Sequence, residues 1–103
     1  MPEALAGSYD RAISMYRTSY SLIAQARADY PNQIGGRVWF APSTATAAAY
    51  IPLYVIADSV PEPYTHGSLF KYDPTVAYWL FNAVGNYANR FYKFAMVDVR
   101  ETI

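Results

Sequence analysis

Few side chains in this sequence have the chemistry of a nucleophile or a general base. Three hydroxyl groups stand close together in a stretch of small residues, at Ser43, Thr44 and Thr46. A hydroxyl nucleophile needs a neighbouring base. The nearest candidates are one histidine and three carboxylates, His66, Asp58, Glu62 and Asp73. Their spacing matches neither a catalytic triad nor a nucleophile elbow, so we interpret the hydroxyls as part of a plain loop.

Metal and thiol chemistry also lack the residues they need. His66 is the sole histidine, and a lone imidazole is a poor metal ligand, so we expect it to make a loop hydrogen bond. Cysteine is absent, which excludes a thiolate metal site and a cysteine nucleophile from this chain. The pair Gly35-Gly36 fits neither glycine-rich phosphate pattern. The sequence therefore predicts no catalytic residue, no metal site and no cofactor.

Arg17 is the remaining candidate for a binding role. If residues 12–21 form a strand, Arg17 shares a face with Ile13 and Met15. An arginine among apolar neighbours pairs with a carboxylate or points at an anionic ligand, because leaving it unpaired is costly. The alternative is that this face is simply solvated. We take Arg17 as a candidate substrate-binding residue.

The composition indicates a surface that needs a partner. Hydrophobic residues make up 53 % of the chain, aromatic residues 17 % and charged residues only 16 %. A single domain of 103 residues needs more polar surface than this, so we expect a fragment of a larger protein or an oligomer. The net charge is zero with no cluster of basic residues, which argues against a nucleic-acid partner. The longest uncharged apolar run, residues 47–57, is too short to span a membrane.

The elements expected in the first two thirds of the chain are mostly strands. Residues 1–10 are interpreted as a loose leader, and residues 11–103 as a single α+β segment. Alternation predicts a strand over residues 11–21, and good helix formers predict one or two helical turns over residues 22–30. Residues 37–42 and 48–56 read as strands that form an antiparallel hairpin. Because Pro52 cannot donate to a sheet ladder, the second strand is expected at an edge or at a bulge.

One long helix is expected at the C-terminal end. Asp73 and Pro74 have the residue types of an N-cap and a first helical position. Apolar residues then recur every three or four positions from Val76 onward. Carried to residue 97, this helix would be about 36 Å long, more than a chain of this size could cover.

Taken together in sequence order, the predicted strands, loops and helix resemble the C-terminal part of the catalytic region of the cysteine dipeptidases. This is the N-terminal-nucleophile family that includes bacterial dipeptidase A and the secernins. The resemblance covers residues 12–100. It rests on five motifs in sequence order: Gln25-Ala26-Arg27; Gly35, Gly36, Trp39 and Phe40; Tyr50, Pro52 and Tyr54; Pro61 and Tyr64; Trp79, Phe81 and Asn82.

The resemblance implies a partial αββα sandwich, an α+β fold of antiparallel strands with a long C-terminal helix. It also implies a hydrolase that cleaves dipeptides with an N-terminal cysteine, and it places Arg17 near the substrate. Since this chain has no cysteine, we expect it to be inactive alone and to pair with the remainder of the hydrolase or with a copy of itself. Two alternatives stay open: a non-enzymatic oligomerisation or scaffold domain, and a binder of apolar ligands in a tyrosine-rich groove.

Overall fold

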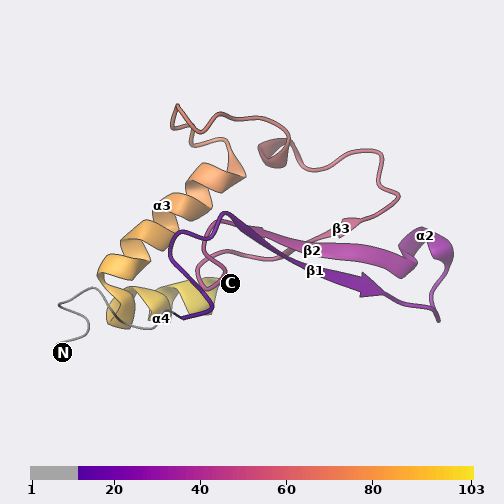
Figure 1. Cartoon of the computed structure of the whole chain (residues 1–103), viewed down its shortest axis with the longest axis horizontal. Coiled ribbons are helices and arrows are strands. Elements are labelled where there is room, and N and C mark those ends of the chain that lie inside the picture. Colours follow the sequence, from indigo (N-terminus) through magenta and orange to yellow (C-terminus); the bar gives the residue numbers. More distant parts are fainter. Residues whose placement is uncertain (1–11) are drawn as a thin grey trace.

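The computed structural model describes residues 12–103 and shows one antiparallel sheet, with two longer helices at one end of it and a short helix at the other (Figure 1). The expected leader, residues 1–10, lies outside the described residues. The elements in chain order are β1 (Tyr20–Ala26), α2 (Asn32–Gly35), β2 (Gly36–Pro42), β3 (Ile51–Tyr54), the 3-10 helix η1 (Glu62–Tyr64), α3 (Ala77–Arg90) and α4 (Tyr92–Thr102). The predicted α+β class is confirmed.

The three strands lie in the order β1-β2-β3, with every neighbouring pair antiparallel. The expected hairpin of β2 and β3 is therefore confirmed, with residues 43–50 as its connection. Pro52 lies opposite Trp39 on β3, which has a strand neighbour on one side only. An edge position tolerates the missing N–H of proline, so the expectation of an edge strand is confirmed.

The predictions for residues 11–30 were wrong. Residues 12–19 contain no strand, and a turn closes there through the hydrogen bond from Thr18 N to Met15 O, 3.1 Å long. The strand starts at Tyr20 and continues through the residues expected to be helical. All seven residues of β1 pair with β2. This ladder overrides the helix propensity of Ala24, Gln25 and Ala26, because propensity is a weak preference that tertiary pairing can exceed.

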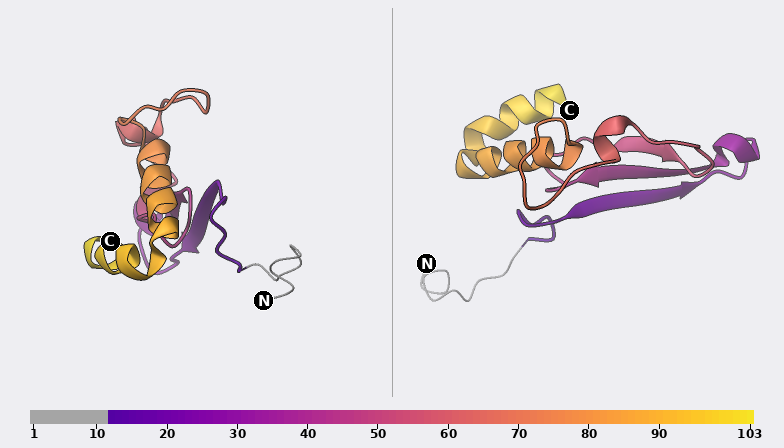
Figure 2. Two further views of the ribbon diagram at one scale, coloured as in Figure 1. Left: turned by 90° about the vertical axis from the view of Figure 1, so that its left-hand side faces the viewer. Right: turned by 90° about the horizontal axis from the view of Figure 1, so that it is seen from above.

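The prediction of a single long C-terminal helix was also wrong. The N-cap of α3 is Val76 rather than Asp73, and the backbone leaves the helical region at Phe91, with φ −126° and ψ 43°. As a result α4 turns away from the axis of α3 (Figures 1 and 2). The Asp73 carboxylate instead accepts hydrogen bonds from the backbone N and the hydroxyl of Thr75, at 2.9 and 2.6 Å. This local turn holds the chain just before the helix begins.

The core is small and is built from small side chains. It lies where α3 packs against the end of β2 and the turn that follows, with Ala41, Thr44, Ala47, Ala77 and Ala88 all at most 4 % exposed. The other end of the sheet, toward α2, has no helix packed over it in the views of Figures 1 and 2. The radius of gyration, 16.7 Å, exceeds the roughly 13 Å of a compact domain of this length. Much apolar surface therefore remains uncovered.

Candidate functional site

A groove with aromatic walls is the most site-like feature of the described residues. It lies between the sheet and the segment that leads into α3 and has a volume of about 290 Å³. We call it the aromatic groove, and its lining residues are Ser19, Tyr20, Phe40, Pro42, Pro63, Tyr64, His66, Val76 and Tyr78. Apolar walls with a few polar groups are typical of sites that bind small organic ligands.

Alternation along the strands places the two strand aromatics of the groove on one face of the sheet. Leu22 pairs with Phe40 and Tyr20 pairs with Pro42, so Tyr20 and Phe40 share a face. Their rings stack at 5.9 Å, and Tyr64 of η1 meets Phe40 edge-on at 6.1 Å. Burial raises the pKa of the Tyr64 hydroxyl, which therefore stays protonated at neutral pH and can donate a hydrogen bond.

His66 lines the polar end of the aromatic groove and is held by its own loop. Its Nδ1 lies 3.1 Å from the carbonyl oxygen of Glu62, and its Nε2 lies 3.3 Å from the hydroxyl of Thr75. That hydroxyl donates to Asp73, and the hydrogen bonds from Thr75 hold the pKa of the Asp73 carboxyl below its ordinary value. The prediction that His66 makes loop hydrogen bonds is confirmed, and both ring nitrogens are engaged.

The hydroxyls at the end of β2 are buried and join separate segments. Ser43 has φ +64° and is 1 % exposed, and Asn82 of α3 donates to its Oγ over 3.4 Å. Thr44, 3 % exposed, donates to the carbonyl oxygen of Tyr16 over 3.0 Å. The loop interpretation is confirmed, while their burial was not foreseen. Within residues 12–103 the hydroxyls of Ser43 and Thr44 form no hydrogen bond to a histidine or a carboxylate.

Arg17 lies in the exposed turn formed by residues 15–18, two residues before Ser19 of the aromatic groove. Because no strand forms there, the shared face with Ile13 and Met15 was a wrong expectation. A substrate-binding role for Arg17 stays a prediction.

A cluster of polar side chains lies on the sheet face opposite the aromatic groove. The sequence alone did not predict that these side chains lie together. Gln25 of β1 lies directly opposite Arg37 of β2. The Gln25 side-chain oxygen accepts hydrogen bonds from Arg37 Nε at 2.8 Å and from Trp39 Nε1 at 3.2 Å. The guanidinium carbon of Arg37 lies 4.4 Å from the centre of the Trp39 ring. The β1–β2 register brings these residues together, and no periodicity in the sequence indicates it.

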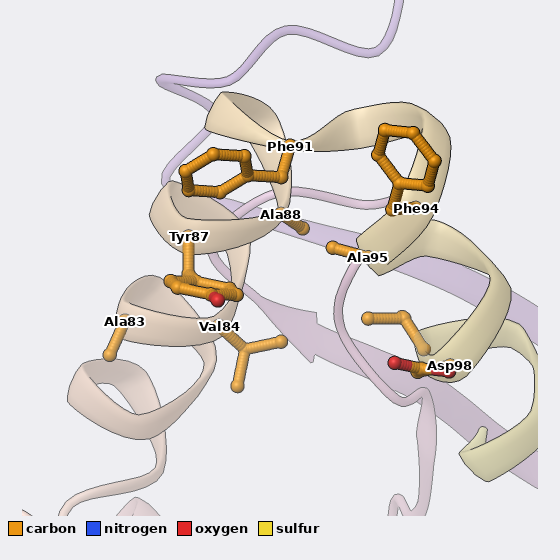
Figure 3. A pocket seen from close by; sticks show the side chains of 9 residues that line it. Ala83, Val84, Tyr87, Ala88, Phe91, Phe94, Ala95 and Asp98 are labelled. Carbon is orange, nitrogen blue, oxygen red and sulfur yellow. The ribbon is translucent and has the colours of Figure 1, made fainter.

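A larger cavity of about 620 Å³ lies between α3 and α4 (Figure 3). Val84, Tyr87, Phe91 and Phe94 line it, and Asp98 is its one charged lining residue. The rings of Tyr87 and Phe91 lie 5.5 Å apart. With a single charged group, this cavity offers little to orient a polar substrate, and it resembles a helix surface that a partner could cover.

Within residues 12–103 no group of three or more histidine, aspartate or glutamate side chains is placed to hold a metal ion, and no helix has the length and apolar character needed to cross a bilayer.

The family model described as peptidase family C69 matches residues 3–103. Neither the curated proteins nor the solved structures contain a match. Because the matched region covers nearly the whole sequence, the chain belongs to peptidase family C69.

Proposed function

We propose that this chain supplies part of the substrate-binding framework of a peptidase that cleaves dipeptides. In this proposal an N-terminal cysteine on a polypeptide segment outside these 103 residues attacks the peptide bond, and its own α-amino group serves as the base. The observation that carries the proposal is the combination of a peptidase family match over residues 3–103 with a complete lack of cysteine. The chain alone is then inactive.

The aromatic groove supports a role in substrate binding. Its volume of about 290 Å³ suits a short peptide, and its walls offer stacking surfaces together with the protonated hydroxyl of Tyr64. Arg17, exposed two residues before the groove begins, is proposed to bind the carboxylate of the peptide. The remaining strands of an αββα sandwich would cover the open faces of the sheet.

The purified chain is expected to bind an unblocked dipeptide such as Phe-Ala without cleaving it. Binding is followed by the shifts of the His66 and Tyr64 ring signals in NMR spectra, and hydrolysis by the release of free amino acids. Arg17→Gln is expected to weaken binding about three- to tenfold, equivalent to about 1 kcal/mol, because it removes an exposed charge-assisted contact.

Arg100→Gln is the matched control for this experiment, because Arg100 is also exposed but lies on α4. Dipeptide turnover that increases in proportion to the amount of chain would contradict the assignment of the nucleophile to another segment. Ring signals that do not move at saturating dipeptide would contradict the binding role of the groove.

A second candidate function, a non-enzymatic oligomerisation or scaffold domain, is favoured by the cavity between α3 and α4. Tyr87, Phe91 and Phe94 around it are 66, 54 and 74 % exposed, an unusual density of exposed aromatic rings for one helical pair. If this function holds, sedimentation equilibrium will give a multiple of 11.6 kDa, and Phe94→Ser will return the mass to that of one chain. A wild-type monomer that exposes no dye-binding apolar surface would exclude it.

A further inference from the structure

We propose that the sheet face opposite the aromatic groove carries a carboxylate-binding site built on Arg37. Gln25, Arg37 and Trp39 lie on this face because each residue directly opposite another on an antiparallel partner points to the same side. Tyr54 of β3 lies opposite Arg37 on its other flank. The site is therefore formed by all three strands and is distinct from the groove lined by Tyr20 and Phe40.

The guanidinium of Arg37 is held in one orientation by two contacts. Its Nε donates to Gln25, whose oxygen is itself fixed by the indole N–H of Trp39. The plane of the guanidinium group is supported by the Trp39 ring at 4.4 Å. These contacts use the Nε position and one face of the group. The edge formed by Nη1 and Nη2 is left to bind a ligand, and its two parallel N–H donors match the two oxygens of a carboxylate.

The surroundings of this edge favour a negative ligand. Within residues 12–103 the groups that hold Arg37, the Gln25 side-chain oxygen and the Trp39 ring, carry no negative charge. Arg27 directly follows β1 and carries a second positive charge at this end of the sheet, where its guanidinium carbon lies 4.2 Å from the centre of the Tyr30 ring. The Nε of Arg27 is buried without a hydrogen-bond partner, although its Nη2 donates to the carbonyl oxygen of Ile34. Half-buried cations with few partners gain more from an anion than fully solvated ones do.

The ligand is identified by its chemistry as a carboxylate beside an apolar or aromatic group, since Ile23, Trp39 and Tyr54 flank the guanidinium along the strands. Such a group can be a free small carboxylate or the Asp or Glu side chain of a polypeptide that covers this face. Both sources present the same two oxygens to Arg37, and they differ in how much surface the rest of the ligand can bury.

The test uses NMR on the full chain, with the Arg37 Nε–H and Trp39 Nε1–H signals as reporters. The free-acid probe is phenylacetate, with phenylacetamide as its uncharged control. The polypeptide probe is acetyl-Leu-Asp-Leu-amide, with the Asn peptide as its control. We expect both acids to shift both signals saturably and both amides to shift neither. Tighter binding of the Asp peptide assigns the site to a covering polypeptide, and tighter binding of phenylacetate assigns it to a free carboxylate.

Three variants decide whether Arg37 acts through its geometry. Arg37→Lys keeps the charge but loses the fork and the Nε bond, so binding of the acids is expected to weaken at least tenfold. Gln25→Leu should weaken it less and speed solvent exchange of the Arg37 Nε–H, as expected of a positioning residue. Arg90→Lys, exposed on α3, should change neither.

Equal responses to acids and amides, or equal binding by Arg37→Lys with the spectrum otherwise unchanged, would overturn the proposal. The proposal does not depend on peptidase activity. Loss of dipeptide binding at the aromatic groove would leave these reporter signals unaffected, so failure of the proposed function and failure of this site are separately visible.

Discussion

Replacing Gly85 by leucine is expected to lower the free energy of unfolding by about 3 kcal/mol. A Cβ at this position would lie 3.3 Å from Thr44 Oγ1, 3.5 Å from Thr44 Cβ and 3.9 Å from Ala47 Cβ. Thr44 cannot move away cheaply because its hydroxyl donates to the carbonyl oxygen of Tyr16. A leucine side chain would therefore push α3 off the turn after β2, where the small core of this chain lies.

Urea unfolding followed by circular dichroism measures this loss. Ala83→Leu is the matched control, since Ala83 lies on the same helix but is exposed, and its effect should stay within about 0.5 kcal/mol. Gly85→Ala should be nearly neutral, because about 1 kcal/mol of helix propensity offsets the tight contact with Thr44. A Gly85→Leu variant as stable as Ala83→Leu would show that α3 does not pack on this turn.

The sequence identified the elements whose signals are local. Residues 37–42 form a short apolar run between a glycine pair and a proline, and Pro52 by itself indicates an edge strand, so β2, β3 and their hairpin were predictable. Each of these predictions depended on residues within a few positions of one another. The α+β class followed from the same local patterns.

The error at β1 occurred because a distant partner decides the outcome. Ala24, Gln25 and Ala26 favour a helix in isolation, yet in the structure they form antiparallel strand pairs with β2. Asp73 has the chemistry of an N-cap, yet it caps a turn three residues before the helix because Thr75 offers it two donors. The break at Phe91 has no proline or glycine to indicate it, and nothing in the sequence explains it.

The predictions about site residues divide in the same way, because local contacts were predictable and contacts set by the tertiary fold were not. The hydrogen bonds of His66 are mostly local and were expected, but its place in a groove beside Phe40 depends on how the segment after β3 folds back over the sheet. Arg17 was selected from a strand pattern that does not form. Arg37 was overlooked because its partners, Gln25 and Trp39, are set by the strand register.

Replacing Gly67 by alanine is expected to cost about 2 kcal/mol of stability for two separable reasons. Its φ of +133° is a conformation that residues with a side chain rarely adopt. An added Cβ would also lie 3.0 and 3.1 Å from the two γ-methyl groups of Val76, which is 5 % exposed and lines the aromatic groove. The variant should therefore disturb both the loop of His66 and the wall of the groove.

A double-mutant cycle with Val76→Ala separates these two causes. Val76→Ala alone should cost about 2 kcal/mol, because it removes two buried carbon atoms and leaves a small cavity. In the double variant the steric contact is gone and only the backbone strain remains. Its loss in urea unfolding should be about 1 kcal/mol smaller than the sum of the single losses. Leu69→Ala, exposed in the same loop, should be neutral. Strict additivity would mean that strain alone accounts for the effect of Gly67→Ala, and that the 66–68 loop does not press on the groove wall.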